Sequence, residues 1–356
     1  ALSFVDGLGS VSYRNLIQKF HSPAGVFKAS AKDLETVGGI RRKVIGQIKG
    51  FTKTAEVKRE LELIAQHQVA LVTFVDDNYP SHLLNIYDPP PFLYVKGEIR
   101  QEDSLAVAVV GSRFASHYGK SAAESISRGL AQEGLTIVSG MARGIDTCAH
   151  RSALSAGGRT IAVLGCGIAV NYPVENRKLK EAIAIQGAVL SEFPMSTPPA
   201  ASHFPMRNRI ISGMSLGVLV AEASHRSGSL ITARLALEQG RDVFAIPGSI
   251  DSLRSRGTHK LIKDGAKLVE VAQDVITELL PQMRPRPRPA ASPQGEETLL
   301  ATEARCILEA LGQNQLQIDR IITETGLKSN QISSILLDLE LKGMVRQLPG
   351  KVFARK

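Results

Sequence analysis

Short apolar runs alternate with amphipathic segments between residues 105 and 280. Six runs have the length and composition of buried strands: Leu105–Val110, Thr136–Ser139, Thr160–Leu164, Ala188–Glu192, Gly217–Ala221 and Val243–Ile246. Helices are predicted between them, over Tyr118–Glu133, Thr147–Ala156, Glu175–Gln186, Met206–Ser212 and Leu230–Gln239. Buried strands that alternate with helices predict an α/β fold with a doubly wound parallel sheet over residues 71–280.

Residues 1–70 show helical spacing of apolar positions, over Val11–Phe20, Ala31–Val37 and Arg41–Gly50. The glycines of Gly7–Gly9 and of Gly38–Gly39 resemble the tight hairpins of helix-hairpin-helix (SAM-like) modules, whose backbone N–H groups can hold a phosphate. A helical cap whose glycines merely end helices explains the same pattern equally well. The sequence leaves both interpretations open.

Two short strands, Ala70–Val75 and Phe92–Lys96, are expected to lead into the sheet. After it, residues 281–295 hold five prolines and three arginines without apolar periodicity, which predicts an extended linker. Residues 296–356 then predict a winged-helix module. Its expected elements are helices over Thr302–Leu311, Ile318–Thr325 and Asn330–Lys342, and a strand pair over Met344–Ala354 that turns at Pro349–Gly350.

The net charge of +9 indicates a polyanionic partner. Residues 1–70 alone hold 11 Lys and Arg against 6 Asp and Glu. Cys148, Cys166 and Cys306 are far apart and odd in number, which argues against a disulfide framework or a zinc site. No apolar run approaches the ~20 residues of a membrane span, and we find no secretory signal. We therefore expect a cytoplasmic protein without a membrane partner or a metal.

Polar and cationic residues gather where the predicted strands end, which is where open α/β sheets bind ligands. The turn Gly111–Arg113 combines a glycine, a hydroxyl and a permanent cation, a set suited to phosphate. Similar groups follow the other strands, and no convincing acid–base pair accompanies them. We therefore expect a site that holds a phosphate backbone, and we expect that the protein is not an enzyme. The candidate residues are Gly111, Ser112, Arg113, Ser139, Gly140, Met141, Arg143, Gly144, Lys178, Arg207, Asn208, Arg209, Gly228 and Ser229.

Three motifs that suggest other chemistry fail on their context. Gly165–Val170 lacks the third glycine of a dinucleotide fingerprint. Gly119–Ser121 resembles the end of a phosphate-binding loop, but Phe114 occupies the place of the first glycine. Gly213–Gly217 fits a nucleophile elbow, yet it precedes a strand where such an elbow follows one. We expect no bound cofactor.

Many short motifs of this sequence, taken in order along the chain, resemble those of the DNA-processing protein A (DprA/Smf) family. The resemblance covers about residues 71–270. It rests on Tyr79–Pro80, Asp88–Pro90, Gly111–Arg113, Ser139–His150, Tyr172–Asn176, Ser191–Pro194, Phe204–Ser212, Arg226–Gly240, Ile246–Ser249 and Gly257–Lys260. It implies an extended Rossmann-like domain that binds single-stranded DNA without base preference. It also implies a homodimer that helps to load RecA recombinase during natural transformation.

By the same resemblance, Arg113 clamps a backbone phosphate and Lys178 does so across the pocket. Gly111, Ser112, Ser139, Gly140 and Asn208 would line that pocket. The chain departs from the usual single-strand groove because it has few aromatic residues and no Trp. Candidates to stack on bases are Tyr172, Phe193 and Phe204.

Three further points remain open at this stage. The site could belong to a nucleotide-processing enzyme of the phosphoribohydrolase type, although Ser227–Leu230 lacks the loop expected there. The winged module could bind DNA or a protein. The patch for self-association, implied by the family, would be Leu261 and Ile262.

Overall fold

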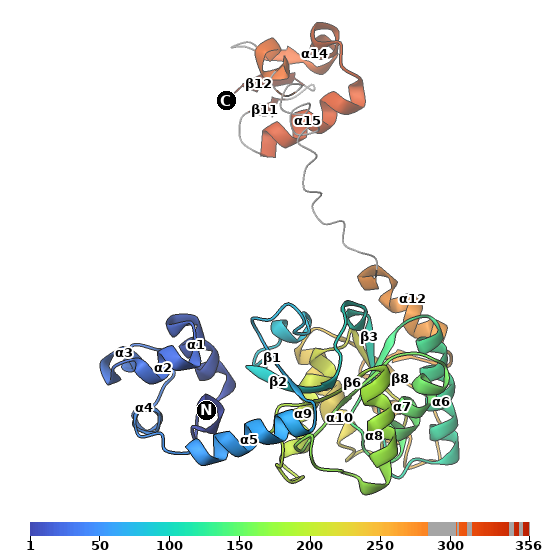
Figure 1. Cartoon of the computed structure of the whole chain (residues 1–356). Helices are drawn as coiled ribbons and strands as arrows, with labels where there is room; N and C mark the ends of the chain where they lie inside the picture. Colours follow the sequence, from blue (N-terminus) through green and yellow to red (C-terminus); the bar gives the residue numbers. More distant parts are fainter. Residues whose placement is uncertain (284–303, 305, 312–314, 342–344, 349–351, 356) are drawn as a thin grey trace. The chain divides into compact units, whose positions relative to one another are not determined.

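The computed structural model describes residues 1–283 and, beyond them, residues 304, 306–311, 315–341, 345–348 and 352–355. The chain divides into two compact units, Ala1–Met283 and Arg284–Lys356. The first unit holds the α/β sheet and an N-terminal group of helices (Figure 1). The second holds a small three-stranded sheet with helices.

The first unit is built on a nine-stranded sheet with the order β1-β2-β6-β5-β4-β3-β7-β8-β9. In this spatial order, every neighbouring pair from β6 through β3 to β9 is parallel. The strand β2 is antiparallel to both of its neighbours, β1 and β6. The doubly wound, mostly parallel sheet expected from the apolar runs is therefore confirmed. The strands are β1 (Ala70–Thr73), β2 (Phe92–Gly97), β3 (Ala106–Val110), β4 (Thr136–Ser139), β5 (Thr160–Val163), β6 (Ala188–Ser191), β7 (Gly217–Val220), β8 (Asp242–Ala245) and β9 (Lys267–Leu268).

Helices cover both faces of this sheet, because successive residues of the buried strands point to opposite sides. Val107 and Val109 of β3 pack against α6 (His117–Gln132), α7 (Ile145–Ser155) and α12 (Ala272–Met283). Ala108 and Val110 pack on the other side, against α9 (His203–Gly213), α10 (Ser229–Glu238) and α11 (Arg256–Lys263). The apolar residues of α8 (Arg177–Gln186) pack against Ala162 of β5.

The chain reverses its winding beside β3. From β3 the strands progress through β4 and β5 to β6, and the connection through α9 then returns to place β7 on the other side of β3. The carboxyl ends of β3 and β7 are therefore neighbours whose following segments turn toward opposite faces. Such a switch point is where sheets of this class hold their ligands.

The first 66 residues are helical, as their apolar spacing predicts. They form α1 (Ser10–Phe20), α2 (Pro23–Lys28), α3 (Ala31–Glu35), α4 (Arg42–Lys49) and α5 (Thr54–Gln66). Leu16, Val26 and Leu34 centre an apolar cluster of their own. The carboxylate of Glu60 on α5 accepts a hydrogen bond of 2.7 Å from the backbone N–H of Met195, which joins these helices to the sheet domain.

The second unit contains β10 (Gln315–Gln317), α14 (Ile318–Thr325), α15 (Ser329–Leu341), β11 (Val345–Leu348) and β12 (Val352–Arg355). Its sheet has the order β10-β12-β11 and is antiparallel. The helix expected at 318–325 is confirmed, and those expected at 302–311 and 330–342 are confirmed over 306–311 and 330–341. The expected strand pair is confirmed as β11 and β12, and its turn at Pro349–Gly350 lies outside the described residues. The short strand β10 has no apolar run and was not expected.

The predicted linker needs a correction at its start. Pro281 was expected to begin an extended segment, but it lies inside α12, which continues to Met283. The Gln282 side chain donates a hydrogen bond of 2.6 Å to Asp242 at the start of β8, so the last turn is held against the sheet. Residues 284–295 of the predicted linker lie outside the described residues. Among the described helices, none combines the length and apolar content needed to span a bilayer.

Candidate functional site

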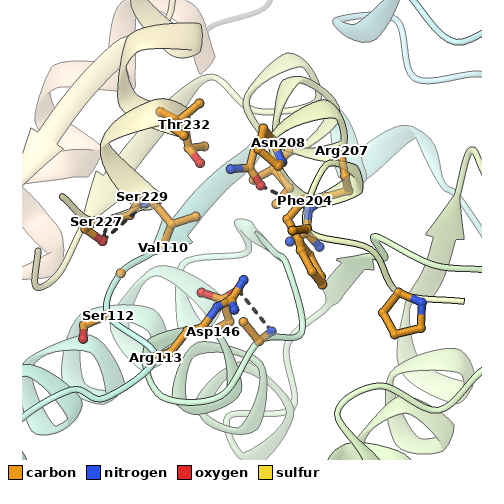
Figure 2. A pocket seen from close by; sticks show the side chains of 18 of the residues that line it. Val110, Ser112, Arg113, Asp146, Phe204, Arg207, Asn208, Ser227, Ser229 and Thr232 are labelled. Carbon is orange, nitrogen blue, oxygen red and sulfur yellow. Dashed lines mark hydrogen bonds between the residues drawn. The ribbon is translucent and has the colours of Figure 1, made fainter.

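A hollow of about 660 Å³ opens at the switch point between β3 and β7. Its walls are the Gly111–Phe114 turn after β3, the first turns of α9, and the start of α10 with the loop before it (Figure 2). A second hollow of about 330 Å³ adjoins it and shares Arg113, Phe114, Tyr172 and Phe204 with it. The sequence-predicted strand ends thus meet in one place.

The Gly111–Arg113 turn is shaped by close backbone packing. A Cβ on Gly111 would come within 2.6 Å of Ile145 Cγ1, so a side chain does not fit there. The N–H of Ser112 donates to the carbonyl of Glu222 at 2.8 Å, and the Ser112 hydroxyl accepts from the N–H of Phe114 at 3.2 Å. These contacts fix the turn that places the Arg113 side chain at the hollow.

Arg113 is exposed, and within the part of the chain that the structure describes it forms no ion pair. Its guanidinium carbon lies 5.0 Å from the centre of the Phe204 ring, within cation–π range. Phe204 in turn lies 5.7 Å from the ring of Tyr172. A Cβ on Gly165 would meet the Phe204 ring at 2.8 Å, so that glycine makes room for it. The Phe204 ring thus holds the Arg113 guanidinium in place, while the N–H donors of the guanidinium still face solvent.

Arg207 and Asp146 line the same hollow as Arg113 and are both buried. The Arg207 guanidinium donates to the carbonyl of Gly140 at 2.7 Å and also to that of Val163. Burial lowers the Arg207 pKa to about 10, with nearby Asp146 opposing the shift. Burial raises the pKa of Asp146 to about 6, against the favourable charges of Arg207 and Arg113 and a hydrogen bond from the Ala142 N–H. Arg207 therefore serves mainly to hold loops together.

Arg209 is directed elsewhere, although the sequence grouped it with Arg207. Its guanidinium donates to Asp88 at 2.8 Å and to Glu192 at 2.7 Å, and its side chain is only 10% exposed. Arg209 does not line either hollow. The two carboxylates neutralise its charge, so we leave Arg209 out of the proposed contact surface.

The loop after β4 forms the base of the adjoining hollow. Ser139 is buried and its hydroxyl donates to the Val109 carbonyl at 2.6 Å. Met141 is buried with a positive φ of 60°, an unfavourable region for a side chain, and its carbonyl accepts from the Asn176 amide at 3.0 Å. Gly144 has a φ of 76° and would clash with the Ser112 carbonyl if it carried a Cβ. These residues support the Gly111–Arg113 turn from below.

The remaining predicted cations lie toward the rim. Arg143 lines the smaller hollow and pairs with Glu175 across neighbouring loops, both side chains being about half exposed. Lys178 is exposed in the first turn of α8 and lines neither hollow. Lys180, which sequence reasoning passed over, is buried, and its amine donates to the carbonyl of Ile168 at 2.8 Å.

The β7 side of the large hollow holds the last predicted residues, Gly228 and Ser229, with Asn208 from α9 between them and Arg207. Thr232 and Ala142 also line this hollow and were missed. Nothing in the sequence distinguishes Thr232 from other helical threonines. The predicted stacking candidate Phe193 instead stacks on His203 at 4.3 Å.

The start of α6 is already filled by a carboxylate of the protein. Glu222, buried at the end of β7, accepts hydrogen bonds of 3.1 and 3.2 Å from the Ser116 N–H and a further one from the Ser116 hydroxyl. Among the described residues, no group of three or more His, Cys, Asp or Glu side chains could hold a metal ion. The site thus offers donors and cations for an anion.

Comparison with known proteins shows the family of the chain. Residues 70–280 match the family model for DNA recombination-mediator protein A, and residues 284–351 match the DprA winged helix domain. Protein Smf of a Synechocystis strain is 36% identical over 388 aligned residues, which cover 100% of this chain and 98% of that relative. The match thus extends over both units.

Two solved structures are similar to the first unit. The DNA processing protein A of Streptococcus pneumoniae superposes with a TM-score of 0.70 at 42% identity, over 78% of this chain and 95% of that one. The Helicobacter pylori protein, whose structure describes a single-stranded DNA binding mode, gives a TM-score of 0.55 at 32% identity, over 61% and 98%. With a family model that matches more than half of its residues, the chain belongs to the DNA-processing protein A (DprA/Smf) family.

Proposed function

We propose that this protein holds single-stranded DNA through backbone phosphates at the switch-point hollow, without base preference and without cutting the strand. The observation that carries the proposal is Arg113, an exposed guanidinium that rests on the Phe204 ring at the mouth of the hollow. A guanidinium without an ion-pair partner can donate two parallel hydrogen bonds to a phosphate, and the Phe204 ring keeps the Arg113 guanidinium oriented. The Helicobacter pylori relative, whose structure describes single-stranded DNA binding, supports the assignment.

The nearby groups extend this contact. Phe204 and Tyr172 provide ring faces between the two hollows, and aromatic faces stack on any base. Lys178 adds an exposed positive charge in the first turn of α8, whereas the charge of Arg143 is paired with that of Glu175. The strand would therefore be held by charge and stacking, neither of which distinguishes one base from another.

The test is the binding of thymidylate oligomers by Arg113→Ala at several salt concentrations. Loss of one phosphate contact predicts weaker binding and a log–log salt slope smaller by about 0.7. Arg234→Ala is the matched control, because Arg234 is exposed and pairs with Glu238 on α10. An Arg113→Ala protein that binds as tightly as the wild type, with the same slope, contradicts the proposal.

A nucleotide-processing enzyme is the second candidate, and Asp146 is the observation that favours it. A buried carboxyl with a pKa raised to about 6, at a hollow suited to phosphate, resembles a general acid. Its position beside the Arg207 side chain gives it a structural role instead. We expect no free base from a panel of nucleoside monophosphates and intact oligomers after incubation. Release of base would favour the enzyme.

We further propose, from family membership, that the protein acts in the cytoplasm as a homodimer that loads RecA during natural transformation. The expected self-association patch is half-buried, since Leu261 packs partly against the core of its own sheet and Ile262 is half-exposed. Sedimentation at increasing protein concentration tests the dimer. RecA filament assembly on DNA coated with a single-strand-binding protein, with and without this protein, tests loading.

A further inference from the structure

The wall of the large hollow that belongs to α10 and α9 carries polar groups that the Arg113 contact does not use. It is formed by Ser227, Gly228, Ser229 and Thr232 at the start of α10 and by Asn208 of α9. In Figure 2, Thr232 and Asn208 lie across the hollow from Arg113, while Ser227 and Ser229 lie on the side of Val110 and Ser112. We call them the α10 wall.

Thr232 is the most informative member of the α10 wall. It is 1% exposed, it lines the hollow, and its hydroxyl forms no hydrogen bond within the described chain. Its oxygen is not among the fully buried side-chain atoms that lack a partner, so the hydroxyl keeps contact with the open space of the hollow. The Thr232 hydroxyl is thus available to a ligand in the hollow.

Asn208 is oriented in the same way by its neighbour. It is 9% exposed, and its Oδ1 accepts a hydrogen bond of 3.2 Å from Arg207 Nε. Because Arg207 can only donate, the amide oxygen must face it, and the Nδ2 group is left on the other side of the amide. No described residue accepts a hydrogen bond from Nδ2, so two further donors remain for the hollow.

The start of α10 adds hydroxyl groups and a favourable helix dipole. Gly228 is the N-cap residue of this ten-residue helix, and a Cβ built on it would meet nothing within 4 Å. The hydroxyls of Ser227 and Ser229 lie 2.7 Å apart, so one donates to the other. The N–H groups of Ser229, Leu230 and Ile231 already donate within this turn, to the Ser227 hydroxyl and to the carbonyls of Ser227 and Gly228. Helix N-termini favour anions. The α10 wall therefore presents an amide and hydroxyls beside a helix start, and no member of it carries a charge.

We propose that the α10 wall is a second phosphate site, without formal charge, which binds a neighbouring phosphodiester of the strand whose first phosphate lies on Arg113. This inference rests on the proposed function. The hollow of about 660 Å³ lies within the ~300–1,000 Å³ typical of sites that enclose a ligand. A phosphodiester matches amide and hydroxyl donors at a helix start, where the helix dipole favours a negative group.

Replacing Thr232 by valine removes the hydroxyl and keeps the shape of the side chain. We expect Thr232→Val to bind thymidylate oligomers about tenfold more weakly, which is the loss of one hydrogen bond to a charged acceptor. Because no cation is lost, the salt slope should stay that of the wild type, in contrast to Arg113→Ala. The thermal midpoint should stay the same or rise, since the hydroxyl has no partner in the protein. Thr232→Ser should restore binding.

A second measurement locates the contact on the strand. A single neutral methylphosphonate is moved along a short thymidylate oligomer. The wild-type protein should show two sensitive linkages, and Thr232→Val should show one of them lost. Thr258→Val is the control, because Thr258 is equally buried but its hydroxyl is bonded to the Ser255 carbonyl outside both hollows.

Full binding by Thr232→Val with an unchanged pattern of sensitive linkages overturns the second site, while Arg113→Ala still reports on the proposed function. A parallel loss of thermal stability that accounts for weaker binding also overturns it, because the hydroxyl would then be structural. If the wild-type protein binds no single strand, both proposals fail together.

Discussion

At the scale of single residues, the charge of Asp146 follows from its position. Its carboxyl is buried near the cations of Arg207 and Arg113, and burial raises its pKa to about 6. Above that pH the group is negative and offsets the cations that are expected to face a phosphate. Below it the group is neutral, and the field at the hollow becomes more positive.

The first prediction is therefore a pH dependence of DNA affinity. Lowering the pH from 7.5 to 5.5 should tighten binding of thymidylate oligomers, because Asp146 takes up a proton as pH falls through about 6. In Asp146→Asn this part of the pH dependence should vanish, with binding at pH 7.5 already near the low-pH value. Fluorescence anisotropy over this range measures it. Equal pH profiles in the two proteins would exclude Asp146 as the titrating group.

The second prediction concerns Gly140, whose missing side chain leaves space for Arg207. A Cβ there would lie 2.6–2.8 Å from the guanidinium atoms of Arg207. Gly140→Ala should therefore displace that side chain from two carbonyls and destabilise the protein by about 1–3 kcal/mol. Gly228→Ala is the comparison, because a Cβ there meets nothing within 4 Å. Chemical denaturation of both variants should separate them, and equal stability would contradict the packing argument.

At the scale of elements, α9 shows why three adjacent residues have three different roles. Successive helical residues are rotated by about 100°, since 3.6 residues complete a turn. Arg207 consequently donates to loop carbonyls, Asn208 faces the hollow, and Arg209 reaches Asp88 and Glu192. The sequence places these residues at one helix start, but the direction of each depends on packing that brings distant carboxylates together.

The third prediction follows from the Arg209 pairs, which hold α9 to the segment before β2 and to the end of β6. Arg209→Ala should lower stability by about 3–5 kcal/mol, because it leaves the largely buried Glu192 without a counter-charge. The exposed pair of Arg234 and Glu238 gives a control, whose loss should cost less than about 1 kcal/mol. Urea unfolding of both variants measures this. Similar midpoints for the two would show that Arg209 is not a buried structural cation.

The elements themselves were largely predictable. All six buried apolar runs of the central segment became strands within one or two residues of their expected ends, because a parallel strand covered on both faces has few polar positions. The strands β9 and β10 were not predicted from the sequence, because they have only two and three residues and no apolar run. Their existence depends on pairing with β8 and β12, which sequence periodicity does not contain.

The position of the candidate hollow was predictable, whereas the arrangement of side chains around it was less so. Gly111–Arg113 was recognisable because a glycine and an arginine follow a buried run, and such strand ends meet at the switch point. The burial of Lys180 and the unbonded state of the Thr232 hydroxyl could not be anticipated, since both depend on contacts from other loops. Phe204 was named as one of three stacking candidates, and only the fold brings it against Arg113.

At the scale of the whole molecule, each unit has its own apolar core. The sheet and the N-terminal helices contribute residues up to Leu279, whereas the core of the second unit begins at Ile307. No described core cluster mixes the two sets. Each unit should therefore be able to fold without the other.

The fourth prediction is that a chain ending at Met283 folds cooperatively and binds thymidylate oligomers within a few-fold of the full-length protein. Circular dichroism melting and anisotropy measure the two properties. A large loss of affinity would assign part of the DNA contact to the winged helix, and retained affinity would leave that module free for a protein partner.

Glu222 has a consequence for selectivity in the cell. Its carboxylate occupies the beginning of α6, where a free nucleotide's diphosphate would otherwise find backbone donors. Because Glu222 belongs to the chain itself, its carboxylate is always present at high effective concentration. ATP and NAD, although abundant, would have to displace it before their phosphates could bind at this helix start. A single strand bound at Arg113, as proposed, would meet no such carboxylate, so free nucleotides should compete little with it.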